Sequence, residues 1–244
     1  MEYSQKKVKE NIEIYPGIFK LTIEGNFNTK PGQFYMLKAW KEGVILPRPI
    51  SIYDVNYNKI SFLYSVVGKG TEILSELKCN DKIEIMGPLG NGFDVNYIRG
   101  KVAIVTGGIG IAPMNYLIKK LTHCKIDLYA GFRSNEFVVN DIKEYVQSVN
   151  ISTENGKKGY KGYVTDLLEP EEYDVVICCG PEIMMKKVVN MCKDKGVEVY
   201  ASMENRMACG IGACLVCTCK THNGNKRTCK DGPVFNGKDL VFDD

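Results

Sequence analysis

The sequence contains little histidine and no long uninterrupted apolar run. Only 2 of its 244 residues are histidines, and neither His123 nor His222 has a partner at a spacing typical of metal ligands. The most apolar segment, residues 102–118, contains three glycines and a proline and falls short of the roughly 20 clean apolar residues of a membrane span. We therefore expect no histidine metal site, no transmembrane helix and no membrane partner.

Blocks of one charge sign are also absent. The 32 basic and 29 acidic residues are interspersed, and the formal net charge is +3. Nucleic-acid binding requires a basic stripe, so we expect no nucleic-acid partner. The N-terminal segment MEYSQKKVKENIEIYPG has positive charges but no apolar run after them, and we expect no signal peptide. No nucleophile and base form a recognisable pair, so we expect no catalytic residue of that kind.

Cysteine, in contrast, is abundant. Without an export signal, ten cysteines indicate a reducing compartment in which clustered thiols bind metal more often than they form disulfides. We therefore expect a cytoplasmic protein. Five cysteines lie scattered in apolar segments, where we interpret them as packing residues: Cys79, Cys124, Cys178, Cys179 and Cys192. The other five fall within residues 209–229.

The pattern of apolar residues changes twice along the chain. Residues 1–98 contain short β-prone runs separated by turns, which predict an antiparallel barrel. Residues 99–201 alternate strands with helices, among them 141–149, and predict a doubly wound parallel sheet. Residues 202–244 are rich in cysteine and glycine and have too few large apolar side chains to fold without a metal centre. The predicted fold class is β + α/β with a small C-terminal module.

The cysteine spacing near the C-terminus is the strongest motif. C-x4-C-x2-C followed by a more distant cysteine is the plant-ferredoxin arrangement of a [2Fe–2S] cluster. Gly210 and Gly212 would let the backbone curl round the cluster and direct amides at its sulfurs. A structural zinc site is the alternative, but zinc usually uses two C-x2-C pairs and only one is present. The predicted ligands are Cys209, Cys214, Cys217 and Cys229.

A fifth cysteine in this region leaves one choice open. Cys219 could replace Cys217 as the third ligand. The C-x2-C pair that Cys217 forms with Cys214 favours Cys217.

Three short segments combine into a candidate FAD site. An arginine on a strand can bind a pyrophosphate through two hydrogen bonds, a nearby serine hydroxyl can reach the flavin ring, and a helix N-terminus attracts phosphate oxygens. The helix expected at 71–78 follows a glycine turn and supplies the last element. Each segment alone could equally be an ordinary barrel strand or turn. The predicted residues are Arg48, Pro49, Ile50, Ser51, Leu63, Tyr64, Ser65, Gly70 and Thr71.

A glycine-rich turn between a strand and a helix predicts a second nucleotide site. The sequence TGGIGIAP lets the backbone approach a pyrophosphate at a helix N-terminus, although its spacing is not G-x-G-x-x-G. A CGP tripeptide at the end of a later strand would close over the nicotinamide. A tight strand–helix connection and a plain strand end are the alternatives. The predicted NAD-binding residues are Gly107, Gly108, Gly110, Cys179, Gly180 and Pro181. Arg133 and Glu136 carry opposite charges, so they do not indicate a choice between NAD and NADP.

The order of these motifs resembles that of a known family. RPIS, LYSVVGKGT, GPLGNGF, TGGIGIAP, CGP, SMENRMACGIGACLVCTCK and CKDGPVF closely resemble the electron-transfer subunits of NAD-linked, two-subunit (class 1B) dihydroorotate dehydrogenases, in the ferredoxin reductase-like superfamily. The likeness covers essentially the whole chain, and the cysteine-rich tail is its most specific part. Asn205 departs from it, because that tail commonly has an acidic residue there.

The resemblance implies a set of cofactors and a partner. It implies FAD and [2Fe–2S] sites at the residues above, NAD(H) as co-substrate, and a separate FMN-containing subunit that oxidises dihydroorotate in pyrimidine biosynthesis, in a heterotetramer with two of each chain. A flavin is required because nicotinamide exchanges electron pairs and a cluster passes single electrons. The alternatives are a bifurcating ferredoxin/NADP-linked subunit, a stand-alone NADH diaphorase, and a redox sensor or zinc-stabilised interaction module without enzymatic activity.

Overall fold

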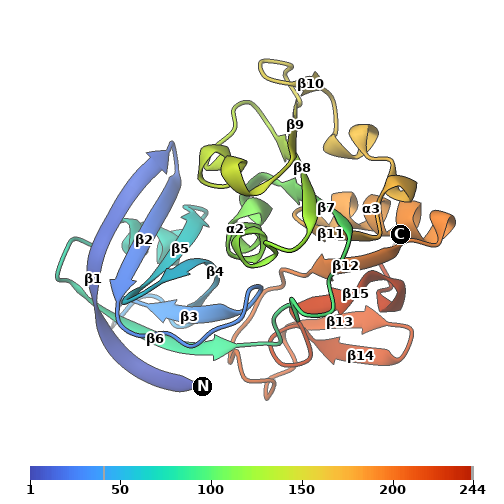
Figure 1. The fold of residues 1–244 in the computed structure, drawn as a ribbon. Coiled ribbons are helices and arrows are strands. Elements are labelled where there is room, and N and C mark those ends of the chain that lie inside the picture. Colours follow the sequence, from blue (N-terminus) through green and yellow to red (C-terminus); the bar gives the residue numbers. More distant parts are fainter. Residues whose placement is uncertain (41, 243–244) are drawn as a thin grey trace.

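The N-terminal part of the chain folds into a closed antiparallel barrel (Figure 1). The computed structural model describes residues 1–40 and 42–242. Alternate residues of each strand, such as Leu21 and Ile23, fill the barrel interior as the period of two in a strand requires. Around the barrel the strands run in the order β1 (Glu2–Tyr15), β2 (Ile18–Glu24), β5 (Lys59–Ser65), β4 (Arg48–Asn56), β3 (Phe34–Lys38) and β6 (Lys82–Leu89).

The second part is a seven-stranded sheet with helices on both faces. Val102 and Ile104 pack with α2 (Ile111–Lys120) in one apolar cluster, whereas Ala103 and Val105 pack with α3 (Glu182–Lys195) in another. In order, the strands are β10 (Tyr160–Lys161), β9 (Ser148–Thr153), β8 (Lys125–Phe132), β7 (Lys101–Gly107), β11 (Val175–Cys179), β12 (Glu198–Ser202) and β15 (Val234–Asn236). All pairings are parallel except that of β15 with β12.

The C-terminal module is attached to both other parts. It contains β13 (Thr218–Thr221), β14 (Gly224–Arg227) and the short helix η6 (Gly237–Asp239), and its strand β15 extends the large sheet. Its cysteines Cys217 and Cys229 share an apolar cluster with Phe34, Met36 and Leu89 of the barrel. The predicted fold class, an antiparallel barrel and a doubly wound sheet with a small cysteine-rich module, is confirmed. No helix in the described ranges is long and apolar enough to cross a membrane.

Two predicted helices differ from the structure. Residues 141–149 form the 3-10 turns η2 (Val139–Asp141) and η3 (Lys143–Tyr145) and the start of β9. Within 141–145 only Ile142 is buried, and a helix without an apolar face to bury has little stability. The helix expected at 71–78 is α1 (Lys69–Ser75). The remaining 3-10 turns are η1 (Gly108–Gly110), η4 (Val164–Leu167) and η5 (Pro170–Glu172).

Helix α2 joins the barrel to the sheet (Figure 1). The Asn115 side chain is fully buried and donates to the Tyr53 carbonyl over 2.8 Å, and Lys119 forms a 2.8 Å ion pair with Asp54. Leu63 of the barrel belongs to the same apolar cluster as α2. A shared core of this kind fixes the two parts against each other, because burying its apolar surface is the main stabilising contribution.

Candidate redox site

Arg48 and α1 meet at one end of the barrel. The Arg48 guanidinium lies 5.4 Å from the centre of the Trp40 ring, and its Nη1 donates to the Leu46 carbonyl over 2.6 Å. A Cβ on Gly70 would lie 2.6 Å from the guanidinium carbon. A side chain at position 70 would therefore displace the Arg48 guanidinium from the first turn of α1. The structure brings Arg48 and Gly70 together, as the sequence predicted.

The Thr71 hydroxyl is used within the turn before α1. Its Oγ1 accepts from the Val67 amide over 2.9 Å and the Gly68 amide over 3.2 Å, and donates to the Gly68 carbonyl over 2.8 Å. Thr71 is buried. Its contribution to a ligand site is therefore to fix the shape of the turn.

The predicted residues on β4 and β5 point to two sides of the barrel wall. Tyr64 faces the interior, where it stacks on Phe19 and its hydroxyl donates to Asn11 over 3.2 Å. Burial raises the pKa of its phenol. Leu63 packs on the outside towards α2, and the alternation places Ser65 on that same outer face. On β4, Ile50 packs on the barrel core, so Pro49 and Ser51 face outward. In the predicted segment of residues 63–65, the Tyr64 side chain therefore points into the barrel, away from those of Leu63 and Ser65.

The glycine loop and the CGP segment are in backbone contact. A Cβ on Gly107 would lie 2.6 Å from Pro181 Cδ, and one on Gly110 would lie 2.6 Å from the Cys179 carbonyl carbon and 2.8 Å from Gly180 Cα. Gly108 has a φ of +53°, and no described atom lies within 4 Å of its Cβ position. The loop is thus closed on the CGP side and open at Gly108.

Glu204 is a neighbour of this site that sequence reasoning missed. The Cys179 thiol is fully buried and lies 4.0 Å from Glu204 Oε1. Burial raises the pKa of the Cys179 thiol well above its usual value, and the nearby Glu204 charge adds to the rise. The pKa of the Glu204 carboxyl is raised too, because the surrounding protein removes part of its hydration. The sequence feature that could have indicated this contact is the place of Glu204 just after strand β12. The parallel neighbour of β12 is β11, which ends at Cys179.

The four predicted cluster cysteines form two pairs. Cys209 interacts with Cys214, and Cys229 interacts with Cys217, whose sulfur accepts the Cys229 amide over 3.4 Å. Cys214 is exposed and Cys209 half-buried, whereas Cys217 and Cys229 are buried. A [2Fe–2S] cluster needs two thiolates on each iron, and the pairs fit that requirement.

Backbone amides already point at these sulfurs. Burial raises the pKa of the Cys209 thiol, but hydrogen bonds from the Cys214 and Ile211 amides, the Cys214 side chain and the Ala213 amide outweigh it and lower the pKa to about 6. Amides directed at sulfur stabilise the thiolate form that binds iron. In Cys229, burial, the contact with Cys217 and the nearby thiol charges together raise the pKa to about 12 despite the Gly212 amide.

Cys219 packs against a different apolar cluster from Cys217 and Cys229. It lies on β13, packs against the α3 side of the sheet, and has its pKa raised by burial. This favours Cys217 over Cys219 as the third ligand. Among the described residues, no three His, Cys, Asp or Glu side chains gather around one point that could hold a metal ion.

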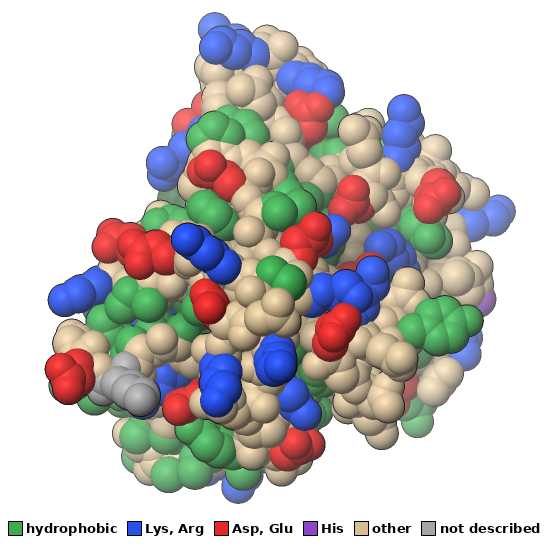
Figure 2. All heavy atoms as spheres, turned by 90° about the vertical axis from the view of Figure 1, so that its left-hand side faces the viewer, with side chains coloured by type: hydrophobic (Ala, Val, Ile, Leu, Met, Phe, Trp, Pro, Cys, Tyr) green, Lys and Arg blue, Asp and Glu red, His purple; other side chains and the backbone are tan. Residues whose placement is uncertain are grey.

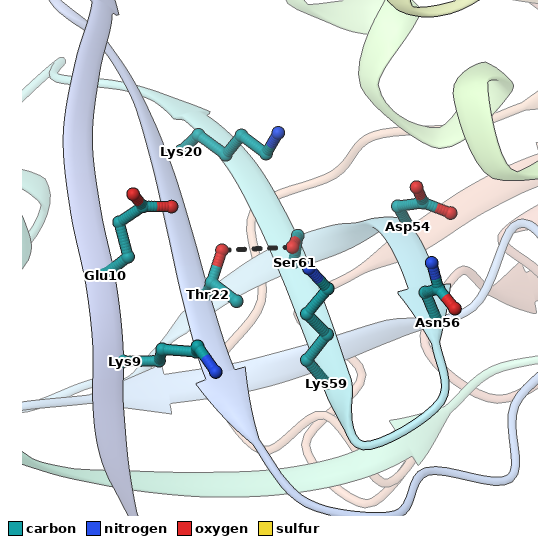
Figure 3. A pocket seen from close by; sticks show the side chains of 8 residues that line it. All are labelled: Lys9, Glu10, Lys20, Thr22, Asp54, Asn56, Lys59 and Ser61. Atoms are coloured by element: carbon teal, nitrogen blue, oxygen red, sulfur yellow. Dashed lines mark hydrogen bonds between the residues drawn. The ribbon is translucent and has the colours of Figure 1, made fainter.

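A separate polar hollow on the outer wall of the barrel contains no predicted site residue (Figure 3). At its floor the Thr22 and Ser61 hydroxyls share a 3.1 Å hydrogen bond, and Lys9 pairs with Glu24 over 2.7 Å. Basic and acidic side chains are interspersed over this side of the molecule (Figure 2). Its lining is Lys9, Glu10, Lys20, Thr22, Asp54, Asn56, Lys59 and Ser61. We assign no role to it.

Solved structures define the class of protein. The chain is similar to an NADH-dependent reduced ferredoxin-NADP oxidoreductase studied for flavin-based electron bifurcation, with a TM-score of 0.86 and 26% identity over 97% of this chain and 89% of that one. It shares its fold with a ferredoxin NADP+ reductase from Neisseria gonorrhoeae, with a TM-score of 0.66 and 17% identity over 84% of this chain and 95% of that one. The architecture is that of the ferredoxin reductase-like flavoproteins.

Sequence relatives identify the family within that class. Residues 204–241 match the "Iron-sulfur cluster binding domain of dihydroorotate dehydrogenase B". The chain is 61% identical to the dihydroorotate dehydrogenase B (NAD(+)) electron transfer subunit of Clostridium acetobutylicum, over 100% of this chain and 99% of the relative. It is 56% identical to that of Clostridium perfringens, over 99% of both. The chain belongs to the family of dihydroorotate dehydrogenase B electron transfer subunits, and the resemblance expected from its sequence is confirmed.

Proposed function

We propose that this chain is the electron-transfer subunit of an NAD-linked dihydroorotate dehydrogenase. Electrons from dihydroorotate, released on a separate FMN-containing subunit, would reach NAD+ through a [2Fe–2S] cluster and FAD on this chain. The observation that carries the proposal is the cysteine module, in which two thiol pairs lie within a segment that matches the iron–sulfur domain of this family.

The barrel end at Arg48 is the proposed FAD site. Arg48 supplies a charge already oriented by Trp40 and Leu46, so it can bind a pyrophosphate with little further ordering. The Trp40 indole N–H is buried and has no partner among the described residues, and an acceptor on the cofactor would satisfy it. The residues proposed to bind FAD are Arg48, Pro49, Ile50, Ser51, Leu63, Tyr64, Ser65, Gly70 and Thr71. Tyr64 would contribute through its backbone, because its side chain is used inside the barrel.

The glycine loop is the proposed site for NAD(H). Gly108 leaves an open backbone surface beside the N-terminus of α2, where the helix dipole favours a pyrophosphate. Cys179, Gly180 and Pro181 close the other side of the loop, with Gly107 and Gly110 as the contact points. Leu63 and Cys179 belong to one apolar cluster, so the proposed flavin and nicotinamide sites both border the core shared by barrel and sheet.

The thiol pairs lie between the barrel and the molecular surface. Cys217 and Cys229, the inner pair, pack against Phe34 and Met36 of the barrel. The loop between Cys209 and Cys214 reaches the barrel too, because a Cβ on Gly210 would lie 2.8 Å from Met36 Cγ. Cys214 of the outer pair is exposed. When bound, the cofactors supply the redox chemistry, because FAD can collect the single electrons that a cluster delivers and pass them on to NAD+ as a hydride. The chain's residues would hold the cluster between the barrel core and the exposed Cys214.

The surface around Cys214 fits a protein partner. Ile211, Leu215 and Val216 are 45%, 61% and 55% exposed, and a patch of large apolar side chains of this kind is typical of interaction sites. The family name implies a catalytic subunit. We propose that this subunit contains FMN, that it docks over Cys214, that the complex is a heterotetramer with two of each chain, and that it is cytoplasmic.

A bifurcating ferredoxin/NADP-linked subunit is the second candidate. It is favoured by the TM-score of 0.86 to the NADH-dependent reduced ferredoxin-NADP oxidoreductase. The identity to that structure is 26%, however, against 61% to the dihydroorotate dehydrogenase subunit. We therefore prefer the orotate-linked function.

The test is to purify the tagged chain without oxygen from its native cells and assay the eluate for NADH-dependent orotate reduction, together with its visible spectrum. We expect flavin and cluster absorbance, a copurifying barrel-sized subunit and orotate turnover. Reduction of dyes by NADH without any orotate turnover would refute the proposed partner, and a spectrum without flavin and cluster would refute the electron-transfer function itself.

A further inference from the structure

The turn that carries Cys229 is closed by one arginine. The Arg227 Nε and Nη2 donate to the two carboxylate oxygens of Asp231 over 2.9 Å and 3.1 Å, and the Arg227 amide donates to Asp231 Oδ2 over 2.8 Å. The Arg227 carbonyl accepts from the amides of Lys230 and Asp231 over 3.0 Å and 2.7 Å. Side chain and backbone thus fix the same turn from two sides.

The same guanidinium reaches the other cysteine loop. Its Nη1 donates to the Gly212 carbonyl over 3.2 Å, and Gly212 lies between Cys209 and Cys214. The Gly212 amide in turn interacts with the Cys229 sulfur. Gly212 therefore contacts the Cys229 turn through both its amide and its carbonyl, and Arg227 is the residue that holds the carbonyl there.

The ion pair has the geometry that makes a partly exposed pair effective. The Arg227 and Asp231 side chains are 32% and 27% exposed. Pairs near the surface contribute little unless they are bidentate and well ordered, and this one is bidentate and anchored by backbone hydrogen bonds.

We propose that Arg227 is a positioning residue for the iron–sulfur cluster, which holds the loop carrying Cys209 and Cys214 against the turn carrying Cys229, with Asp231 fixing its orientation. The inference rests on the proposed function, because it takes the four cysteines as the ligands. Mutation of a residue that orients a metal ligand through hydrogen bonds typically lowers metal affinity or activity by about 10- to 100-fold. Arg227 also brings a positive charge close to Cys229 and Cys217.

The test separates the hydrogen bonds of Arg227 from its charge. Arg227→Lys keeps the charge but loses the planar fork that reaches Asp231 and Gly212 together, whereas Arg227→Gln loses both. Lys226→Gln is the matched control, because it removes a charge from the neighbouring strand position and leaves the hydrogen bonds of Arg227 to Asp231 and Gly212 in place. The measurements on the purified holoprotein are iron release to a chelator, the cluster midpoint potential, and reduction of FAD by NADH.

We expect both Arg227 variants to release iron about 10-fold or more faster than the wild type, with Lys226→Gln unchanged. The potential should become more negative in Arg227→Gln and stay close to wild type in Arg227→Lys, because only the former loses the charge. FAD reduction should be unchanged in all three. Iron release at the wild-type rate in Arg227→Lys would overturn the proposal.

Asp231→Asn provides an independent check. If Asp231 acts by orienting Arg227, the double variant Asp231→Asn, Arg227→Lys should release iron no faster than the faster of the two single variants. Additive acceleration would overturn the orienting role of Asp231. A wild-type chain without iron and sulfide would refute the cluster and the proposed function, whereas a wild-type cluster with unaffected variants would refute only the role of Arg227.

Discussion

Gly110→Ala perturbs the contact between the glycine loop and the CGP segment without straining the backbone. Gly110 has φ −59° and ψ −11°, which alanine adopts readily. If there were space, the substitution would stabilise the fold by about 0.4–1 kcal/mol. The new Cβ would instead lie 2.6 Å from the Cys179 carbonyl carbon and 2.8 Å from Gly180 Cα, under the 3.0 Å that real Cβ contacts respect.

The two loops must therefore separate. Overpacking of this kind costs about 1–3 kcal/mol, so we expect a net loss of about 1–2 kcal/mol, which is about 2–8 °C in the unfolding midpoint of a chain of this length. A displacement near 1 Å at a reaction centre can cost about 100-fold in rate. We expect the reduction of FAD by saturating NADH, followed by stopped-flow absorbance, to slow by about 10-fold or more with the flavin content unchanged.

Gly108→Ala is the control for this prediction. Gly108 has a φ of +53° and no described atom within 4 Å of its Cβ position, so alanine there costs about 1–2 kcal/mol of backbone strain and leaves the CGP contact intact. We expect a higher KM for NADH with a near-normal rate at saturation. FAD reduction at the wild-type rate in Gly110→Ala would show that the loop contact does not place the nicotinamide.

Three further predictions concern single side chains. Arg48→Ala should weaken FAD binding by about 1.5–3 kcal/mol, about 10- to 150-fold in Kd by flavin dialysis; full flavin occupancy at dilute protein would contradict this. Cys219→Ser should keep the wild-type iron and sulfide content, and loss of the cluster would make Cys219 a ligand. The raised pKa of Glu204 means that this carboxyl binds a proton more readily in the folded chain than in the unfolded one. Its contribution to stability therefore falls as the pH rises from the pKa of Glu204 in the unfolded chain to the higher pKa in the folded chain. In melting curves recorded at a series of pH values, the unfolding midpoint of Glu204→Gln should fall less with rising pH than that of the wild type. An equal pH dependence of the two midpoints would contradict this.

The sequence predicted those parts of the molecule that local patterns determine. The six barrel strands follow from alternating apolar residues between turns, and the contact of Arg48 with Gly70 was expected from residues 22 apart because each belonged to a recognisable segment. The proximity of the glycine loop to the CGP segment follows from two parallel strands that end at the same edge of a sheet.

Tertiary contacts determined what the sequence could not predict. The short strand Val234–Asn236 joins the large sheet through pairing with β12, and its three residues are too few to show a period. Residues 141–149 contain helix-forming side chains, but the Tyr53 hydroxyl donates to Asp141 over 2.6 Å and ties the segment to the barrel. Glu204 and Arg227 had no local motif, because each acquires its partner only on folding.

The order of electron carriers is the central claim, and Cys214→Ser tests it most directly. The measurement is stopped-flow reduction of FAD by NADH together with orotate turnover, in the complex with the catalytic subunit, with the exposed Cys79→Ser as control. We predict that Cys214→Ser loses cluster absorbance and orotate turnover while NADH still reduces FAD, and that Cys79→Ser resembles the wild type. Wild-type orotate turnover in a Cys214→Ser complex without its cluster would contradict the order NAD(H), FAD, cluster, partner flavin.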